Sequence, residues 1–260
     1  MNAIIIKIIC LVVPALIFSG MFSACGSDET RKASDRPAAH NTLTPGEVEE
    51  GWMLLFDGET TDGWRGYNKP HFPESGWVVE DGTLRCIGTG QGEAGGRGGD
   101  IIYDRKFHNF RLSLEWKVSE GGNSGIFYLG QEIEGEPVWK SAPEMQILDN
   151  ERHPDANRGV AGNRQAGALY DLIPAVPQNT RPAGEWNHAE VLVYRGMVVH
   201  IQNGEDVVEY HLGTSDFERM IAESKFANFP EFGKNRPGYI ALQDHGDDVW
   251  FRNIKILVMD

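Results

Sequence analysis

The sequence predicts an all-β protein, an antiparallel β-sandwich with one short peripheral helix. Several segments alternate apolar and polar side chains with a period of two, which is the pattern of a half-buried strand. Glycine is frequent, at 31 of 260 residues, and 10% of the residues are aromatic, which is typical of loop-rich β proteins. Only one segment has a strong helical pattern, so helices and strands do not alternate as they do around a parallel sheet.

Residues 1–24 are expected to be a signal peptide. A lysine precedes the short apolar run IICLVVPALIFSGMF, and Pro14 interrupts that run, which argues against a membrane span. Ala24 and Cys25 then resemble the lipobox of bacterial lipoproteins, although Phe22 stands where leucine is usual. The resemblance implies a lipid-anchored protein of the Bacteroidetes surface type. Its expected location is the outer membrane or the periplasm, and the cell surface is the alternative. An ordinary secretory signal is the other interpretation.

The mature chain is expected to be a tethered single domain. Residues 25–43 comprise the lipidated cysteine and a polar segment without apolar periodicity, which predicts a flexible tether. Residues 44–260 form the domain, in which Cys86 is the one cysteine, so an intradomain disulfide is excluded and Cys86 is expected in the core. The net charge of -14 argues against a nucleic-acid partner.

Five segments of this domain have strand patterns. In RLSLEWKV, residues 111–118, apolar and polar residues alternate strictly, so Trp116 is expected to be buried. The dipeptide Asn203-Gly204 predicts a tight hairpin. Strands are expected at 111–118, at 124–130, three times within 189–212, at 238–244 and at 249–258, where the alternation is imperfect.

The one amphipathic helix is expected at residues 215–226, outside the sandwich. Ser215 and Glu218 have the spacing of a capping box, and Phe217 begins the apolar face. A single helical turn is also expected at TPGEVEEGW, where Thr44 is the N-cap.

The stretch APEMQILDNERHPD, residues 142–155, concentrates side chains that can perform chemistry. Because side chains of a strand alternate between its faces, Glu144 and Gln146 are expected on one face and Ile147 in the core. Asp149 falls on the opposite face unless a β-bulge intervenes. The alternative is an edge strand with a solvated polar face.

Two other segments add polar candidates at strand ends. Asn123 follows a pair of glycines and begins a strand, and Asp244 and His245 end another strand. None of the common hydrolase, nucleotide-binding or zinc motifs is present in the sequence. No cofactor is therefore predicted. Binding of a divalent metal ion stays an open question, because several metal-ligating side chains are present but no spacing motif joins them: Asp149, His153, Asp155, Asp244 and His245.

The chain resembles the 3-keto-disaccharide hydrolase domain family, which has a concanavalin A-like lectin/glucanase sandwich. The resemblance rests on motifs that follow one another in order across residues 51–259: GWMLLFDGETTDGWRGY, GWVVEDGTL, GGDIIYDRKFHNFRLSLEWKVSEGGNSGIFYLG, PEMQILDN, GALYDLIPA, GEWN and IALQDHGDDVWFRNIKI.

The resemblance implies a concave, sugar-binding sheet that carries the PEMQILD strand. Laminarinase-like glucanases of this fold have an E-x-D-x-x-E strand, and here Gln146 and Asp149 stand where its second and third carboxylates are expected. A conventional double displacement needs two well-placed carboxylates. A 3-keto sugar does not, because its ketone acidifies the proton on carbon 2, and one base can start an elimination that water addition completes.

The resemblance also implies roles for particular residues. Glu144 is the first candidate for the base and His245 the second, and Tyr170 is a candidate acid or stacking wall. Carbohydrate substrate is expected to contact the donors and platforms Gln146, Asn123, Lys140, Asp149, Asp244, Trp64, Trp139 and Trp186. The alternatives are a conventional glycoside hydrolase of laminarinase-like fold and a non-catalytic surface lectin.

Replacing Cys25 with Ala is expected to move the protein from the membrane fraction to the soluble fraction, because the thiol that carries the acyl chains is lost. A single saturated chain binds only marginally, so several chains are expected to supply the anchor. Fractionation and immunoblotting measure the shift, and Cys86→Ala is the control that should stay in the membrane fraction. An unchanged distribution of Cys25→Ala would contradict the lipoprotein prediction.

Overall fold

The computed structural model describes residues 39–89 and 96–260. The predicted signal peptide, residues 1–24, and Cys25 lie outside these residues. Within the described ranges, no helix has both the length and the apolar character that crossing a membrane requires.

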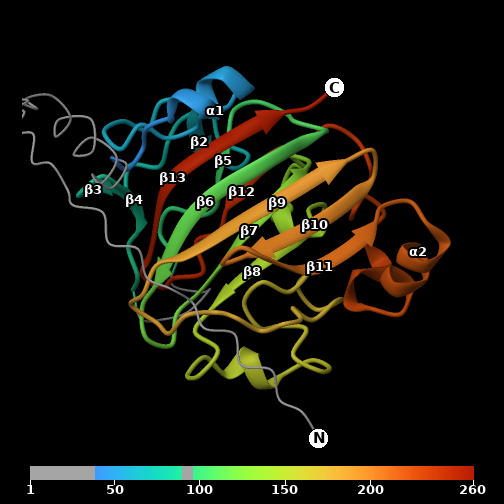
Figure 1. Cartoon of the computed structure of the whole chain (residues 1–260). Coiled ribbons are helices and arrows are strands. Elements are labelled where there is room, and N and C mark those ends of the chain that lie inside the picture. Colours follow the sequence, from blue (N-terminus) through green and yellow to red (C-terminus); the bar gives the residue numbers. More distant parts are fainter. Residues whose placement is uncertain (1–38, 90–95) are drawn as a thin grey trace, which may run out of the picture. The chain divides into compact units, whose positions relative to one another are not determined.

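Two antiparallel sheets build the domain (Figure 1), which confirms the predicted β-sandwich. The larger sheet has the order β11-β10-β9-β6-β13-β4-β3, with β1 also paired to β13. Its strands are β1 (Met53–Leu54), β3 (Trp77–Glu80), β4 (Thr83–Cys86), β6 (Phe110–Val118), β9 (Asn187–Tyr194), β10 (Met197–Gln202), β11 (Glu205–His211) and β13 (Val249–Val258).

The smaller sheet carries the stretch that the sequence singled out. Its order is β2-β5-β12-β7-β8, so β8 is an edge strand and β7 is its neighbour. The five strands are β2 (Trp64–Gly66), β5 (Ile101–Tyr103), β12 (Tyr239–Leu242), β7 (Asn123–Gly130) and β8 (Glu144–Leu148).

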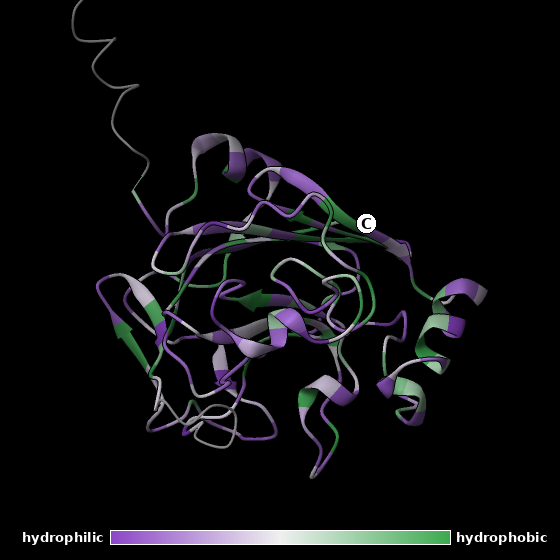
Figure 2. Ribbon diagram, turned by 90° about the horizontal axis from the view of Figure 1, so that it is seen from below, coloured by the Kyte–Doolittle hydropathy of each residue, from purple (hydrophilic) through white to green (hydrophobic). Residues whose placement is uncertain are grey.

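The main core lies between the two sheets. Trp116 is 1% exposed and Ile147 is fully buried, as predicted, and both belong to one apolar cluster that joins the sheets. Cys86 is also buried there as a free thiol. Hydrophobic residues follow the strands while hydrophilic residues are frequent in the connecting segments (Figure 2), as expected for a sandwich that buries one face of each sheet.

A β-bulge explains the imperfect alternation in β13. The pairing of β13 with β6 shifts register between Arg252 and Lys255, and Asn253 has a positive φ of 53°. Phe251 before the bulge and Ile254 after it are both fully buried. Because of the extra residue, odd-numbered positions face the core before the bulge and even-numbered positions face it after the bulge. A strict period of two therefore does not describe the whole strand.

The helices are short and differ in detail from the prediction. The N-terminal α1 (Pro45–Glu50) has the expected Thr44 capping box. The peripheral α2 (Ser215–Ala222) is capped by Thr214, whose hydroxyl accepts from the backbone N–H of Phe217, so the predicted Ser215 capping box is wrong by one residue. Short 3₁₀ helices complete the set, η2 (Val138–Lys140), η3 (Pro154–Asn157) and η4 (Lys225–Asn228).

The end of the predicted tether contacts the domain. Asn41 is 7% exposed, its backbone N–H donates to Asn253 Oδ1, and its side chain donates to the carbonyl of Gly82. Ordered contacts therefore begin before the expected boundary at residue 44.

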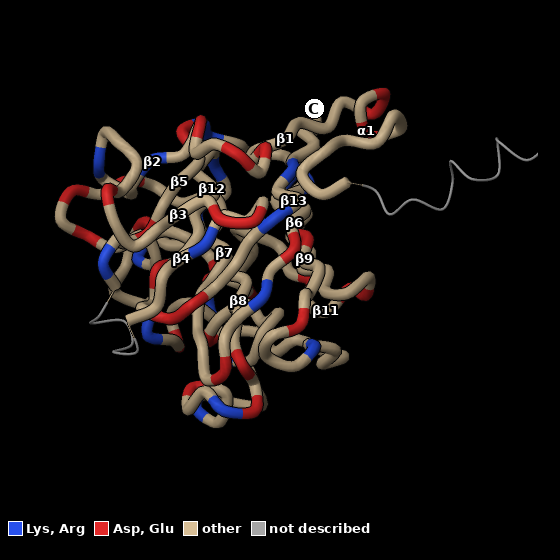
Figure 3. Tube along the Cα trace, turned by 90° about the vertical axis from the view of Figure 1, so that its left-hand side faces the viewer, with Lys and Arg blue, Asp and Glu red and all other residues tan. Residues whose placement is uncertain are grey.

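Residues of both charges occur along the strands of the larger sheet (Figure 3), and opposite charges pair between neighbouring strands. Arg252 of β13 pairs with Glu115 of β6 at 2.6 Å, and Arg111 of β6 pairs with Glu190 of β9. Ion pairs in contact with solvent typically contribute under about 1 kcal/mol each, and these partly exposed pairs therefore add little to stability.

A buried polar network bridges the two sheets. His200 of β10 is fully buried, its Nδ1 donates to the carbonyl of Gly167 at 3.0 Å, and its Nε2 lies 2.7 Å from the hydroxyl of Tyr128 in β7. That hydroxyl in turn lies 2.8 Å from the hydroxyl of Tyr210. Burial lowers the pKa of His200 from its ordinary value of 6.5 to about 4, so the imidazole is neutral in the fold at neutral pH.

Acid is expected to destabilise the protein through His200. His200 binds a proton below about pH 6.5 in the unfolded chain, but only near pH 4 in the folded chain. The contribution of the neutral imidazole to the free energy of unfolding is therefore complete above pH 6.5 and is lost as the pH falls from 6.5 to 4. The loss in the free energy of unfolding by pH 4 is roughly 3 kcal/mol. Urea denaturation at several pH values measures it.

His200→Gln should flatten this part of the pH dependence, because glutamine has no proton to gain. His108→Gln, which removes a histidine bonded to Asn235 at the surface, is the control and should retain the wild-type profile. Identical profiles for wild type and His200→Gln would contradict the prediction.

Candidate active site

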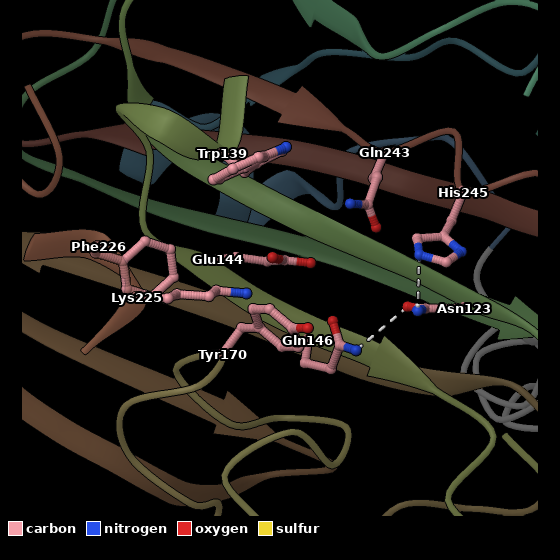
Figure 4. Close-up of a pocket in the computed structure, with 9 residues that line it drawn as sticks. All are labelled: Asn123, Trp139, Glu144, Gln146, Tyr170, Lys225, Phe226, Gln243 and His245. Atoms are coloured by element: carbon pink, nitrogen blue, oxygen red, sulfur yellow. Dashed lines mark hydrogen bonds between the residues drawn. The ribbon is translucent and has the colours of Figure 1, made fainter. Parts of the chain in front are cut away.

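A pocket opens on the face of the smaller sheet that points away from the main core (Figure 4). Strands β7, β8 and β12 meet below it, and the segments η2 and η4 supply its walls. The side chains that line it are Asn123, Trp139, Glu144, Gln146, Tyr170, Lys225, Phe226, Gln243 and His245.

Strand alternation places the central carboxylate. Met145 and Ile147 of β8 point into the core, so Glu144 and Gln146 point into the pocket, where both are buried. Gly125 pairs with Gln146 across β7 and β8, and a Cβ at Gly125 would lie 2.1 Å from Glu144 Oε1. The missing side chain at this position is therefore what leaves room for the carboxylate.

A chain of side-chain amides runs from Glu144 to His245. The amide nitrogen of Gln146 must face Glu144 Oε1, at 3.0 Å, and the carbonyl of Ser124, at 3.2 Å, because a carbonyl oxygen can only accept. The oxygen of Gln146 then faces the side-chain amide of Asn123 at 3.2 Å, and the other end of that amide lies 3.2 Å from His245 Nε2.

A lysine supplies positive charge from the opposite wall. The Lys225 ammonium points toward Glu144 in Figure 4, and it lies 4.1 Å from the centre of the Tyr170 ring and 3.8 Å from Asp171 Oδ2. Burial lowers the pKa of Lys225, while the negative charges of Asp171 and Glu144 oppose that shift.

Tyr170 is held by a carboxylate behind the pocket. Its hydroxyl donates to Asp155 Oδ2 at 2.8 Å. Burial and this bond to Asp155 raise the pKa of Tyr170, so the phenol is protonated at neutral pH. Aromatic surface on the other walls comes from Trp139, whose ring packs edge-on against Phe229 at 5.2 Å, and from Phe226.

Six of the predicted site residues meet in this pocket, and they are Glu144, His245, Tyr170, Gln146, Asn123 and Trp139. Three others lie elsewhere, which corrects their predicted placement. Lys140 pairs with Glu136 outside the pocket. Trp64 is a core residue that donates to the carbonyl of Leu55, and Trp186 lies on the larger sheet with Arg252 stacked 3.9 Å from its ring centre.

The two predicted aspartates stabilise loops instead of lining the pocket. Asp149 follows the end of β8 and accepts from the backbone N–H groups of Gly121 and Glu151. Asp244 accepts from the backbone N–H groups of Gly98 and Gly99 at 2.9 and 3.0 Å. Short acidic side chains at strand ends commonly bond to nearby backbone in this way.

Three pocket residues escaped the sequence analysis. Gln243 directly precedes the predicted residues Asp244 and His245 at the end of a strand, and that position is a usable signal. Lys225 and Phe226 were assigned to the end of the predicted helix, but α2 ends at Ala222 and they belong to η4. No pattern in the sequence indicates that a segment this far along the chain returns to cover β8.

A metal-ligating cluster adjoins the pocket at His245. His153, His245 and Asp247 each offer a ligand atom, and these atoms lie within 4.8 Å of one another. Of the other members of the predicted set, Asp149 and Asp244 bond to backbone as described above, and Asp155 accepts from the hydroxyl of Tyr170.

Comparisons with known proteins identify the family. Residues 51–257 match the model of the 3-keto-alpha-glucoside-1,2-lyase-like domain. A curated protein of Bacteroides thetaiotaomicron named 3-keto-disaccharide hydrolase is 46% identical over an alignment 281 positions long, which covers 96% of this chain and 97% of that protein. The chain therefore belongs to this family of carbohydrate-active enzymes, as its sequence motifs predict.

Solved structures agree with this assignment. A candidate glycosyl hydrolase from Parabacteroides distasonis ATCC 8503 superimposes with a TM-score of 0.76 at 32% identity, over 85% of this chain and all of that one. A second candidate glycosyl hydrolase of the same organism gives a TM-score of 0.59 at 25% identity, over 80% of this chain and 99% of that one.

Proposed function

We propose that this enzyme cleaves the glycosidic bond of 3-keto-glucosides, including 3-keto-disaccharides, by proton abstraction at carbon 2, elimination and hydration. The name of the Bacteroides thetaiotaomicron relative and the description of the family support the substrate class. The composition of the pocket supports the type of mechanism.

The observation that carries the proposal is the number of carboxylates in the pocket. Glu144 is the one carboxylate among the nine described side chains that line it. Conventional retaining and inverting glycosidases need a second carboxylate across the scissile bond, and the nearest candidate in the sequence motif, Asp149, bonds to backbone N–H groups instead. A pocket with one base fits an elimination better than either conventional displacement.

The reaction balances with one base and one acid. Glu144 takes the proton from carbon 2, and the electrons of that C–H bond form an enolate with the carbon 3 ketone. The enolate returns its electrons to expel the oxygen on carbon 1, which takes the proton that Glu144 removed and leaves as an alcohol. Water then adds at carbon 1 while carbon 2 regains a proton, so the net reaction is hydrolysis.

The cation and the donors of the pocket stabilise the enolate. Lys225 is the cation that we assign to this role, in place of the predicted Lys140, because its ammonium lines the pocket and interacts with Glu144. Gln146 and Asn123 orient the catalytic side chains. The hydroxyl of Tyr170 is committed to Asp155, so the ring acts as a wall rather than as the acid.

We further propose that Cys25 anchors the enzyme by lipid to the outer membrane, facing the periplasm or the cell surface. The lipobox resemblance at Ala24-Cys25 supports this location.

The reaction is tested by comparing a 3-keto-glucoside with its parent glucoside in deuterated water. We expect turnover of the keto sugar alone, with deuterium at carbon 2 of the product, because the enolate is reprotonated from solvent. Mass spectrometry and NMR measure the label. A hydrolysed product without deuterium would contradict the elimination, equal turnover of the parent would favour a conventional glycosidase, and binding without turnover would favour a lectin.

Glu144→Gln is expected to lower turnover about a hundredfold or more, because it keeps the shape of the side chain and removes the base. Gln146→Ala should cost less, since it removes a hydrogen-bond donor only. Glu136→Gln, which alters a carboxylate paired with Lys140 outside the pocket, is the matched control and should keep wild-type turnover. Near-normal turnover in Glu144→Gln would transfer the role of the base to His245.

A further inference from the structure

A cluster of metal-ligating side chains adjoins the pocket, which one of its members, His245, also lines. His153 stands just before η3, in the segment that follows β8, whereas His245 and Asp247 lie between β12 and β13. One ligand atom from each lies within 4.8 Å of the other two. The rings of His153 and His245 are nearly perpendicular, at 83°, with centres 6.0 Å apart.

The amide chain fixes which nitrogen of His245 faces this cluster. Because Gln146 turns its nitrogen to Glu144, its oxygen lies 3.2 Å from Asn123 Oδ1, and two oxygens cannot form a hydrogen bond. We therefore assign the Asn123 amide in the turned orientation as well, which places its nitrogen beside Gln146 and its oxygen where Nδ2 lies, 3.2 Å from His245 Nε2. The ring proton of His245 therefore resides on Nε2. Histidines that bind metals usually donate their second ring N–H to such an oxygen, and the lone pair on Nδ1 is then the ligand.

Asp247 presents a carboxylate oxygen to that lone pair. Its Oδ2 lies 3.8 Å from His245 Nδ1 and accepts the backbone N–H of Asn123 at 3.1 Å. The separation of 3.8 Å is too long for a direct hydrogen bond. Two ligands on one tetrahedral metal ion with bonds near 2.1 Å are about 3.4 Å apart, so only a small closure brings these atoms into a coordination sphere.

His153 completes the cluster at a modest cost. In the structure its Nδ1 accepts the backbone N–H of Asp155 at 3.2 Å. A metal ion on this ring replaces that bond, and the loss of one such hydrogen bond costs about 1 kcal/mol.

We propose that His153, His245 and Asp247 bind one divalent transition-metal ion of the zinc type. Two imidazoles and one carboxylate suit Zn²⁺, Co²⁺ and Ni²⁺, whereas Mg²⁺ and Ca²⁺ prefer oxygen ligands only. Three protein ligands leave a further position for water or for a substrate oxygen. The ion ties the segment after β8 to the β12–β13 connection and fixes the His245 ring at the end of the pocket.

Calorimetric titration of the full-length, chelator-treated protein with Zn²⁺ tests the proposal. We expect one zinc ion per chain, a higher Tm with bound zinc, and no comparable binding of Mg²⁺. Asp247→Asn and His153→Gln should each weaken zinc binding at least about tenfold. Asp247→Asn keeps an oxygen for the Asn123 N–H, so it removes the charge of the ligand with little change to the loop.

His108→Gln is the matched control, because it removes a histidine that bonds to Asn235 away from the cluster, and it should bind zinc like the wild type. Absence of one-to-one zinc binding by the folded protein would overturn the proposal, as would wild-type affinity in both ligand variants. Circular dichroism verifies that each variant is folded. Since no sugar is present, a negative result leaves the proposed reaction untouched.

Discussion

The pairing of β7 with β8 is the constraint on which the site depends. In this register Gly125 lies opposite Gln146, and Ile126 lies opposite Met145. A slip of one residue would turn Glu144 and Gln146 into the core and expose their apolar neighbours. Burying an aliphatic side chain contributes about 1.5–3 kcal/mol, so Met145 and Ile147 hold the register that directs the carboxylate outward.

The same pairing explains how a carboxylate is tolerated at 6% exposure. An unpaired buried charge is costly, but the Gln146 amide donates to Glu144 and the Lys225 ammonium lies in the same pocket. The orientation of the Gln146 amide then propagates through Asn123 to His245. The assignment of the Gln146 amide, set by Glu144 and the Ser124 carbonyl, therefore bears on which nitrogen of His245 carries the proton at the other end of the pocket.

The sequence predicts the placement of residues in regular strands, which depends on local periodicity. It does not predict which distant segments fold back over the sheet. Strict alternation was enough to place Trp116, Ile147, Glu144 and Gln146 correctly, because one face of each strand must reach the core. Periodicity fails at the bulge around Asn253, where the parity changes within one strand.

Residues outside the regular elements were harder to place. Asp149 has the spacing of a catalytic carboxylate, but β8 ends at Leu148 and the free backbone N–H groups of the turn take its oxygens. Lys225 is the opposite case, because it lines the pocket although no spacing in the sequence points to it. It reaches the pocket only because α2 stops at Ala222 and the chain turns back, and no spacing in the sequence encodes that path.

The proposed base, Glu144, and the proposed cation, Lys225, stand on different kinds of structure, and the physics of the roles proposed for them explains why. Proton abstraction from carbon requires the base within hydrogen-bond reach of one atom, so Glu144 gains from a position on a strand that is paired with its neighbour. The attraction between an ammonium and an enolate falls only with the inverse of distance, so it tolerates a looser position. Lys225 is accordingly carried by a short 3₁₀ segment and is steadied by Asp171 and the face of Tyr170. Because burial lowers the pKa of Lys225, this ammonium also gives up a proton more readily than a solvated one, which suits the enolate-stabilising role that we propose for it.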